Sequence, residues 1–141
     1  MKYLIATILY LVSASAFSYD CGERPFRTST NNNGEKIGLF AAKEYFVASP
    51  KWEIGEGEPP LQISEAIALV STWANQKYTR FDSMEIRSVQ LQERSCIDSK
   101  GDWLYVVELD PVIDGNKLFG GSYTVAVTMA GEIIESKRIN E

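Results

Sequence analysis

The order of the hydrophobic patterns constrains this chain most, because one helical stripe is followed only by alternating apolar segments. The stripe recurs every three or four residues: Ile63, Ile67, Val70, Ala74, Tyr78 and Phe81. This spacing predicts an amphipathic helix over residues 65–78, with Ser64 as the N-cap residue and Glu65 in the first turn. Such a helix must bury its apolar side, and the remaining segments have to supply the partner surface.

The segments after residue 81 have the two-residue period of strands. Residues 103–109 are apolar in both phases, which predicts a central strand that is covered on both faces. A change of phase near residues 87–88 predicts a bulge, and Ala130-Gly131 predicts the turn of a last hairpin. These strands should form an antiparallel sheet on which the helix lies.

The residues before the helix carry weaker signals. Residues 44–48 predict a short strand that ends at Ser49-Pro50. The polar run at 28–34 predicts a solvated surface loop, and the Gly- and Pro-containing residues 51–60 predict an exposed linker. The expected fold class is therefore α+β, with one main helix packed across an antiparallel sheet of four to five strands in two layers.

The first residues resemble an export signal. Residues 1–18 begin with Lys2, continue with an apolar run of about ten residues, and end with small residues, as secretory signals do. A membrane anchor would need about 20 apolar residues. We therefore expect a signal peptide at 1–18, cleaved after Ala16 or Ser18, and one domain at 19–141 with an N-terminal arm. A periplasmic or secreted location follows, with no stable membrane anchor after cleavage.

Export changes the expected role of the two cysteines. In an oxidising compartment, Cys21 and Cys96 are expected to pair as a structural disulfide. The bond would close a loop of about 75 residues and, by the chain-entropy argument, contribute about 4 kcal/mol. A redox pair or a reactive thiol is the alternative, but the chain has neither a Cys-x-x-Cys spacing nor a histidine near either thiol.

Composition excludes several function classes. The chain has no histidine, so a Ser-His-Asp triad, a Cys-His site and a His-ligated metal are excluded. Lys and Arg number 14 against 19 Asp and Glu, for a formal charge of −5. Because phosphate affinity comes from clustered cations, nucleic acid is not an expected partner.

The carboxylates do not form a recognisable catalytic or metal-binding pattern. Glu53, Glu56 and Glu58 lie in the predicted linker, where burial would be too slight to raise a pKa. Asp110 and Asp114 lie near a glycine turn but lack the ligand spacing of a calcium loop. The expectation is no enzyme, no cofactor and no metal, although a small-ligand pocket in a concavity of the sheet stays open.

One tryptophan invites a functional interpretation. Trp73 and Trp103 are expected in the core, but Trp52 lies in the acidic linker. It either packs against the start of the helix or anchors a partner, since exposed tryptophans are typical of binding centres. The candidate partner-binding residues are therefore Tyr45, Trp52, Glu53, Glu56 and Glu58.

Three segments together resemble the PepSY-like and cystatin-like group of small exported domains. They are the helix opening at 59–68, the aromatic strand at 103–107 and the glycine-turned hairpin at 123–134, and the similarity extends over about 59–139. The resemblance implies a domain that binds or restrains other exported proteins, and it supplies no catalytic residue. The Gln-x-Val-x-Gly loop of cystatin inhibitors is absent from the chain, so their protease-inhibitor role is not transferred.

Two functions are consistent with these observations. The first is a non-enzymatic exported binding module for a protein or peptide partner. The alternative is an inhibitor of a cationic hydrolase, such as a lysozyme-type enzyme or a peptidase. Removal of the leader, whose one charged residue is Lys2, leaves a net charge of about −6, and Glu53, Glu56 and Glu58 form a loop of uncompensated negative charge. Both features motivate the alternative, because opposite fields accelerate encounter.

Overall fold

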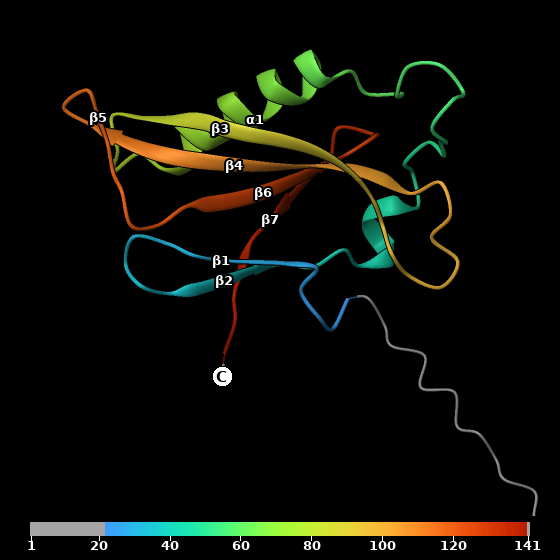
Figure 1. The fold of residues 1–141 in the computed structure, drawn as a ribbon, viewed down its shortest axis with the longest axis horizontal. Coiled ribbons are helices and arrows are strands. Elements are labelled where there is room, and N and C mark those ends of the chain that lie inside the picture. The colour runs from blue at the N-terminus through green and yellow to red at the C-terminus, as the bar shows by residue number, and fades with distance from the viewer. Residues whose placement is uncertain (1–21, 141) are drawn as a thin grey trace, which may run out of the picture.

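The computed structural model describes residues 22–140 and shows three stacked layers (Figure 1). The helix α1 (Ile63–Lys77) lies on one face of a five-stranded antiparallel sheet, and a smaller three-stranded sheet covers the other face. The α+β class and the antiparallel sheet with its one main helix are confirmed. The second sheet was not part of the expected two-layer arrangement and adds a third layer.

Helix α1 begins two residues earlier than expected. Its N-cap residue is Gln62 rather than Ser64, and Glu65 at the third helical position accepts a hydrogen bond from the Gln62 backbone N–H at 3.0 Å. This reciprocal capping arrangement satisfies amide groups that the first turn leaves without intrahelical partners. Ala66, Val70 and Ala74 form the buried face. The predicted stripe was therefore only partly right, because Ile63 and Ile67 lie at the margin of the interface.

The large sheet has the strand order β3-β4-β6-β7, with β5 attached to one end of β4. Its strands are β3 (Ser83–Glu93), β4 (Trp103–Ile113), β5 (Asn116–Lys117), β6 (Tyr123–Thr128) and β7 (Ile133–Glu135). The register between β3 and β4 shifts between Ile86 and Ser88, which confirms the predicted bulge. The turn between β6 and β7 contains Gly131 at φ 83°, where a glycine is favoured.

Strand β4 is buried on both faces, as its doubly apolar sequence predicted. Tyr105, Val107 and Leu109 pack under α1 in the larger core. Leu104 and Val106 point to the opposite face and belong to a second core. Since successive side chains of a strand alternate between faces, the same strand serves two hydrophobic clusters.

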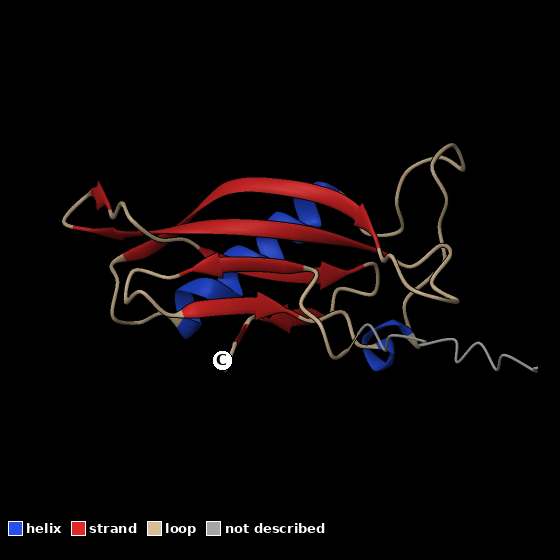
Figure 2. Ribbon diagram, turned by 60° about the horizontal axis from the view of Figure 1, so that its bottom comes forward, coloured by secondary structure: helices blue, strands red, loops and turns tan. Residues whose placement is uncertain are grey.

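The second core is closed by elements before the helix and by the C-terminal segment. The small sheet has the order β1-β2-β8, from β1 (Arg27–Thr30), β2 (Lys36–Leu39) and β8 (Lys137–Arg138). The 3-10 helix η1 (Lys43–Phe46) follows β2 and buries Phe46 (Figure 2). The expected strand at 44–48 was therefore wrong: Ala42 is extended, but the chain then turns, so that Phe46 can reach the core beside Leu39.

The polar run at 28–34, expected to be a surface loop, differs in two ways: residues 28–30 belong to strand β1, and the first asparagine is structural. Asn31 is buried, and its side-chain oxygen accepts hydrogen bonds from the backbone N–H groups of Asn33 and Glu35, both at 3.0 Å. This arrangement closes the β1–β2 turn as an Asx-type turn. Gly121 packs so closely that a Cβ there would lie 2.4 Å from backbone atoms of Asn31 and Asn32. Contact with the loop before β6 thus joins the small sheet to the large one.

The buried phenol of Tyr78, at the end of α1, is expected to make the fold less stable at alkaline pH. Tyr78 stacks on Tyr123 with ring centroids 4.8 Å apart, and burial, then Tyr123 and Glu135, raise its pKa from 10.0 to about 12. Because the folded-state pKa is above the unfolded value, the Tyr78 proton stabilises the fold below pH 10, and this contribution is lost as pH rises to 12.

We expect this loss to be about 1 kcal/mol, since the partial exposure of the phenol reduces the full value for two pKa units. Urea unfolding at about pH 9.5 and about pH 11.5 measures it. The decrease should be smaller in Tyr78→Phe than in the wild type, and equal decreases would contradict the assignment.

Candidate partner-binding site

A groove runs between the first half of α1 and strand β3. Its volume is about 460 Å³. The lining residues come from the segment before α1, the helix and two strands: Glu58, Pro59, Gln62, Ile63, Ser64, Val89, Leu91 and Tyr105. Side chains of the lining are apolar along the strand and acidic or amide-bearing near the start of the helix. The groove therefore offers apolar contacts along the strand and polar contacts near the start of the helix.

One flank of α1 forms the first wall. Positions 63, 67, 71 and 75 are four residues apart and so form one row along a helix. Asn75 in this row accepts a hydrogen bond from the Met84 backbone N–H of β3 at 3.1 Å, which places the row on the β3 side. Ile63 and Ile67 are 52% and 38% exposed, so the upper half of this flank presents uncovered apolar surface.

Strand β3 forms the second wall. Val89 pairs with Val107 and Leu91 with Tyr105, so both strand residues point to the α1 side of the sheet. Tyr105 lines the floor, and its hydroxyl donates a hydrogen bond to the Leu61 carbonyl at 2.8 Å. Burial, and then the nearby Glu65, raise the pKa of the Tyr105 phenol. The floor of the groove is therefore neutral and held in place by the segment leading into the helix.

The outer edge of β3 is open along the groove. Within residues 22–140, β3 pairs only with β4 and is the terminal strand of the large sheet. A terminal strand presents backbone N–H and C=O groups that can pair with a further strand. The groove thus combines a side-chain surface with a hydrogen-bonding backbone edge.

The rim near the start of α1 is acidic. Glu58 accepts a hydrogen bond from the Gln62 amide at 3.0 Å, and Glu65 follows in the first turn of the helix. Among the described residues that line the groove there is no lysine or arginine. The electrostatic character of this end therefore favours a cationic group.

The three predicted glutamates do not act as one cluster. Glu53 forms an ion pair with Lys100 at 3.0 Å, so it is not the uncompensated charge that the sequence suggested. Glu56 accepts a hydrogen bond from the Glu53 backbone N–H at 3.2 Å and so shapes its own loop. Of the three residues, only Glu58 lines the groove.

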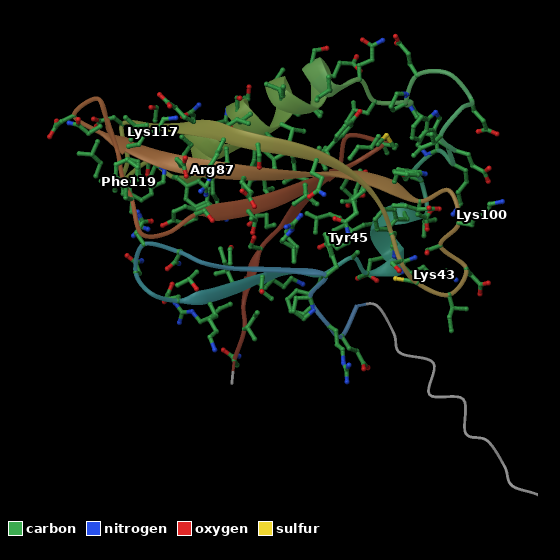
Figure 3. All side chains as sticks on the ribbon, viewed as in Figure 1. Lys43, Tyr45, Arg87, Lys100, Lys117 and Phe119 are labelled. Atoms are coloured by element: carbon green, nitrogen blue, oxygen red, sulfur yellow. The ribbon has the colours of Figure 1, made fainter. Side chains whose placement is uncertain are left out.

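The two predicted aromatic residues lie elsewhere. Trp52 is 8% exposed and packs edge-to-face on Trp103 of β4 at 5.2 Å, so it is a buried residue rather than an exposed anchor, and the ring contact is with the strand rather than with the start of the helix. Tyr45 is half-buried beside the second core, and Figure 3 shows it at η1, on the side of the large sheet opposite α1. The five candidate residues therefore do not form a single site.

A buried ion cluster near η1 escaped sequence interpretation. The Asp102 carboxylate forms an ion pair with the Lys51 ammonium, and its second oxygen lies 3.4 Å from the Arg94 guanidinium. The Arg94 Nε–H also donates a hydrogen bond to the Ala41 carbonyl at 2.8 Å. The guanidinium lies 5.1 Å from the centre of the Phe46 ring, a cation–π distance. The cluster joins η1, the linker and the β3–β4 loop, so its role is to hold these segments together.

A second cavity of about 320 Å³ lies beside this cluster, between Phe26, Ala41 and Leu104 and close to Cys96. Cys21, the expected disulfide partner of Cys96, lies outside the described residues, as does the predicted signal peptide. The Cys21–Cys96 bond stays a prediction.

The described part of the chain offers little for two other classes of site. Residues 22–140 contain no group of three or more acidic, Cys or His side chains placed to hold a metal ion. Of the helices in that range, none has the length and apolar character needed to cross a membrane. Asp110 instead pairs with Arg87 at 3.2 Å, which assigns it to the sheet surface.

Sequence reasoning missed the groove because it took the whole apolar stripe as buried. The available signal was the position of Ile63 and Ile67, which continue the stripe toward a linker rather than toward a strand. Their exposure depends on the extent of the opposing sheet, which only the tertiary structure shows. Compared with known proteins, the chain matches no family model, no curated protein and no solved structure.

Proposed function

We propose that this protein is an exported, non-enzymatic module that binds a protein or peptide partner through the groove between α1 and β3. The observation that carries the proposal is a groove that combines the exposed Ile63 with the half-buried Val89 and Leu91 beside an open strand edge. The exposed Ile67 continues the apolar surface one turn further along the same row of α1. Apolar surface that is flanked by polar groups is typical of interaction sites. The proposed relation to PepSY-like and cystatin-like domains agrees with this role.

The acidic rim supports a cationic partner. Glu58 and Glu65 stand at one end of the groove, and the whole chain carries a formal charge of −5. Complementary charge accelerates association and selects among partners. The alternative proposal, an inhibitor of a cationic hydrolase, rests on the net negative charge of the chain and on the acidic loop that contains Glu58, and it would make the hydrolase itself the partner.

Site-specific photo-crosslinking tests the binding proposal. A benzoylphenylalanine at position 64, whose serine is exposed and lines the groove, is expected to crosslink one discrete exported protein or peptide. Position 72, also exposed on α1 but roughly opposite the buried face, is the matched control and is expected to give no such product.

The captured partner would be identified by mass spectrometry, purified and titrated against the wild-type protein. Capture of a hydrolase whose rate falls on binding would favour the inhibitor alternative. Equal products from positions 64 and 72, or none from either, would contradict the proposal.

A further inference from the structure

We infer that the outer edge of β3 takes up an extended cationic segment of the partner as an additional strand beside α1. This inference rests on the proposed function and specifies how the groove would bind. In strand addition, the backbone edge supplies affinity and the pockets for alternate side chains supply specificity. Both components are present at β3.

The edge of β3 is regular and unprotected beside the groove. The bulge lies between Ile86 and Ser88, and pairing with β4 is uninterrupted over residues 88–93. Six strand residues span about 20 Å. Residues 88–92 contain no charged residue and no proline, whereas natural edge strands are commonly protected by charges, prolines or bulges. This stretch is therefore a pairing surface rather than a protected edge.

The groove would select the side chains of the added strand. Alternate residues of a strand point to the same face, so every second side chain of the ligand would enter the groove. There it would meet Ile63 on one wall and Val89 and Leu91 on the other, and Ile67 lies one turn further along the same row of α1. These apolar walls favour β-branched or aliphatic side chains at alternate positions.

The opposite face imposes a different preference. Gln90 pairs with Val106 and therefore points away from α1, where its amide accepts a hydrogen bond from Arg27. The intervening ligand residues would lie on this polar side. The preferred segment thus alternates apolar and polar residues.

Charge indicates which kind of chain would supply that strand. Glu58 and Glu65 at the rim favour Lys or Arg at an end of the segment, and Glu65 offsets the positive end of the helix dipole. A second copy of this chain is a weaker candidate, because pairing two β3 edges would bring two molecules of charge −5 together. The occupant we propose is a cationic strand of another protein or peptide.

Defined peptides test the inference. The probe is acetyl-Lys-Val-Thr-Val-Thr-Val-Lys-amide, titrated against the full mature chain by calorimetry. N-methylation of the central Val and the neighbouring Thr removes N–H groups on both edges of the peptide, and we expect affinity to fall at least tenfold. A peptide with one methyl group on each Lys side chain has the same charge and number of added methyl groups, and it should bind as the parent does.

Matched protein variants locate the interaction. Ile67→Glu places a charge on the groove wall, whereas Leu69→Glu changes a leucine of similar exposure, 41%, on the flank of α1 that lies near Gly131. We expect at least tenfold weaker peptide binding for Ile67→Glu and little change for Leu69→Glu. Glu58→Gln should weaken binding about threefold at low salt, while Glu132→Gln, an exposed glutamate in the β6–β7 turn, should not.

Amide hydrogen exchange gives a readout specific to strand addition. Peptide should slow exchange in residues 88–93 of β3 and leave β7, the terminal strand at the opposite edge of the large sheet, unchanged. Strand addition is overturned if backbone methylation of the peptide has no effect and the Ile67→Glu and Leu69→Glu variants bind the peptide equally well. The binding module would still stand in that case if position 64 captures a partner. Self-association that Ile67→Glu abolishes, without peptide binding, would assign the edge to a second copy and also overturn the inference.

Discussion

Replacing Asp102 by alanine is expected to lower the free energy of unfolding by about 4 kcal/mol. The side chains of Asp102 and Arg94 are 4% and 5% exposed, so the substitution would leave a buried guanidinium without its counter-charge. Removal of one partner from a buried ion pair is costly because the other charge stays desolvated. Urea denaturation of purified Asp102→Ala, followed by tryptophan fluorescence, measures the loss, since Trp52 and Trp103 lie in the neighbouring chain segments.

The exposed member of the cluster is the control. The Lys51 side chain is 58% exposed, so Lys51→Met should cost less than about 1 kcal/mol. The double variant Arg94→Met with Asp102→Leu should be less destabilised than the sum of its single changes, because no unpaired charge remains. A loss below about 1 kcal/mol for Asp102→Ala would show that the cluster does not hold η1 and the β3–β4 loop together.

Leu104→Ala is expected to destabilise the protein by about 3 kcal/mol. Leu104 is fully buried on the face of β4 opposite α1, against Leu39, Phe46 and Ile134. The cost combines lost transfer free energy with the cavity that the neighbours cannot fill. Chemical denaturation monitored by circular dichroism gives the value.

A partly exposed leucine on the flank of α1 near Gly131 provides the comparison. Leu69 lies on α1, is 41% exposed, and its replacement by alanine should change stability by less than about 1 kcal/mol, aided by the higher helix propensity of alanine. Similar small effects at positions 104 and 69 would mean that the small sheet does not seal the second core.

The elements that sequence analysis predicted well are those with long, regular periods. Helix α1 and the long strands β3 and β4 have apolar residues at constant spacing over six or more positions. The β6–β7 hairpin has a turn that is marked by a glycine. The bulge in β3 was predictable because it appears in the sequence as a change of phase. In each case the signal is local and needs no knowledge of the partner surface.

The small sheet had no comparable signal. Strands β1, β2 and β8 have four, four and two residues, too few to establish a period. Pairing of Ile37 with Arg138 also joins positions about 100 residues apart. Residues 43–46 form a helical turn rather than a strand because this conformation buries Phe46 in the second core. Such choices depend on tertiary contacts, which override weak local preferences.

The candidate site was predictable only in part. Glu58 was expected to take part in binding and lies on the groove, whereas Trp52 is buried and Tyr45 lies on the other side of the sheet. Ile63 and Ile67 were expected in the core but are exposed. Export, the Cys21–Cys96 disulfide and the nature of the partner stay predictions.

The amino-acid sequence by itself determined one helix, its antiparallel strands and the absence of histidine chemistry, because these follow from local spacing and composition. The tertiary structure decided which apolar residues are covered. A stripe reveals which side of a helix is apolar, but the extent of the opposing sheet determines how much of that side is buried. Here β3 is the last strand of the large sheet and no further strand covers the helix there, so Ile63 and Ile67 stay exposed and an apolar groove lies at the edge of the sheet.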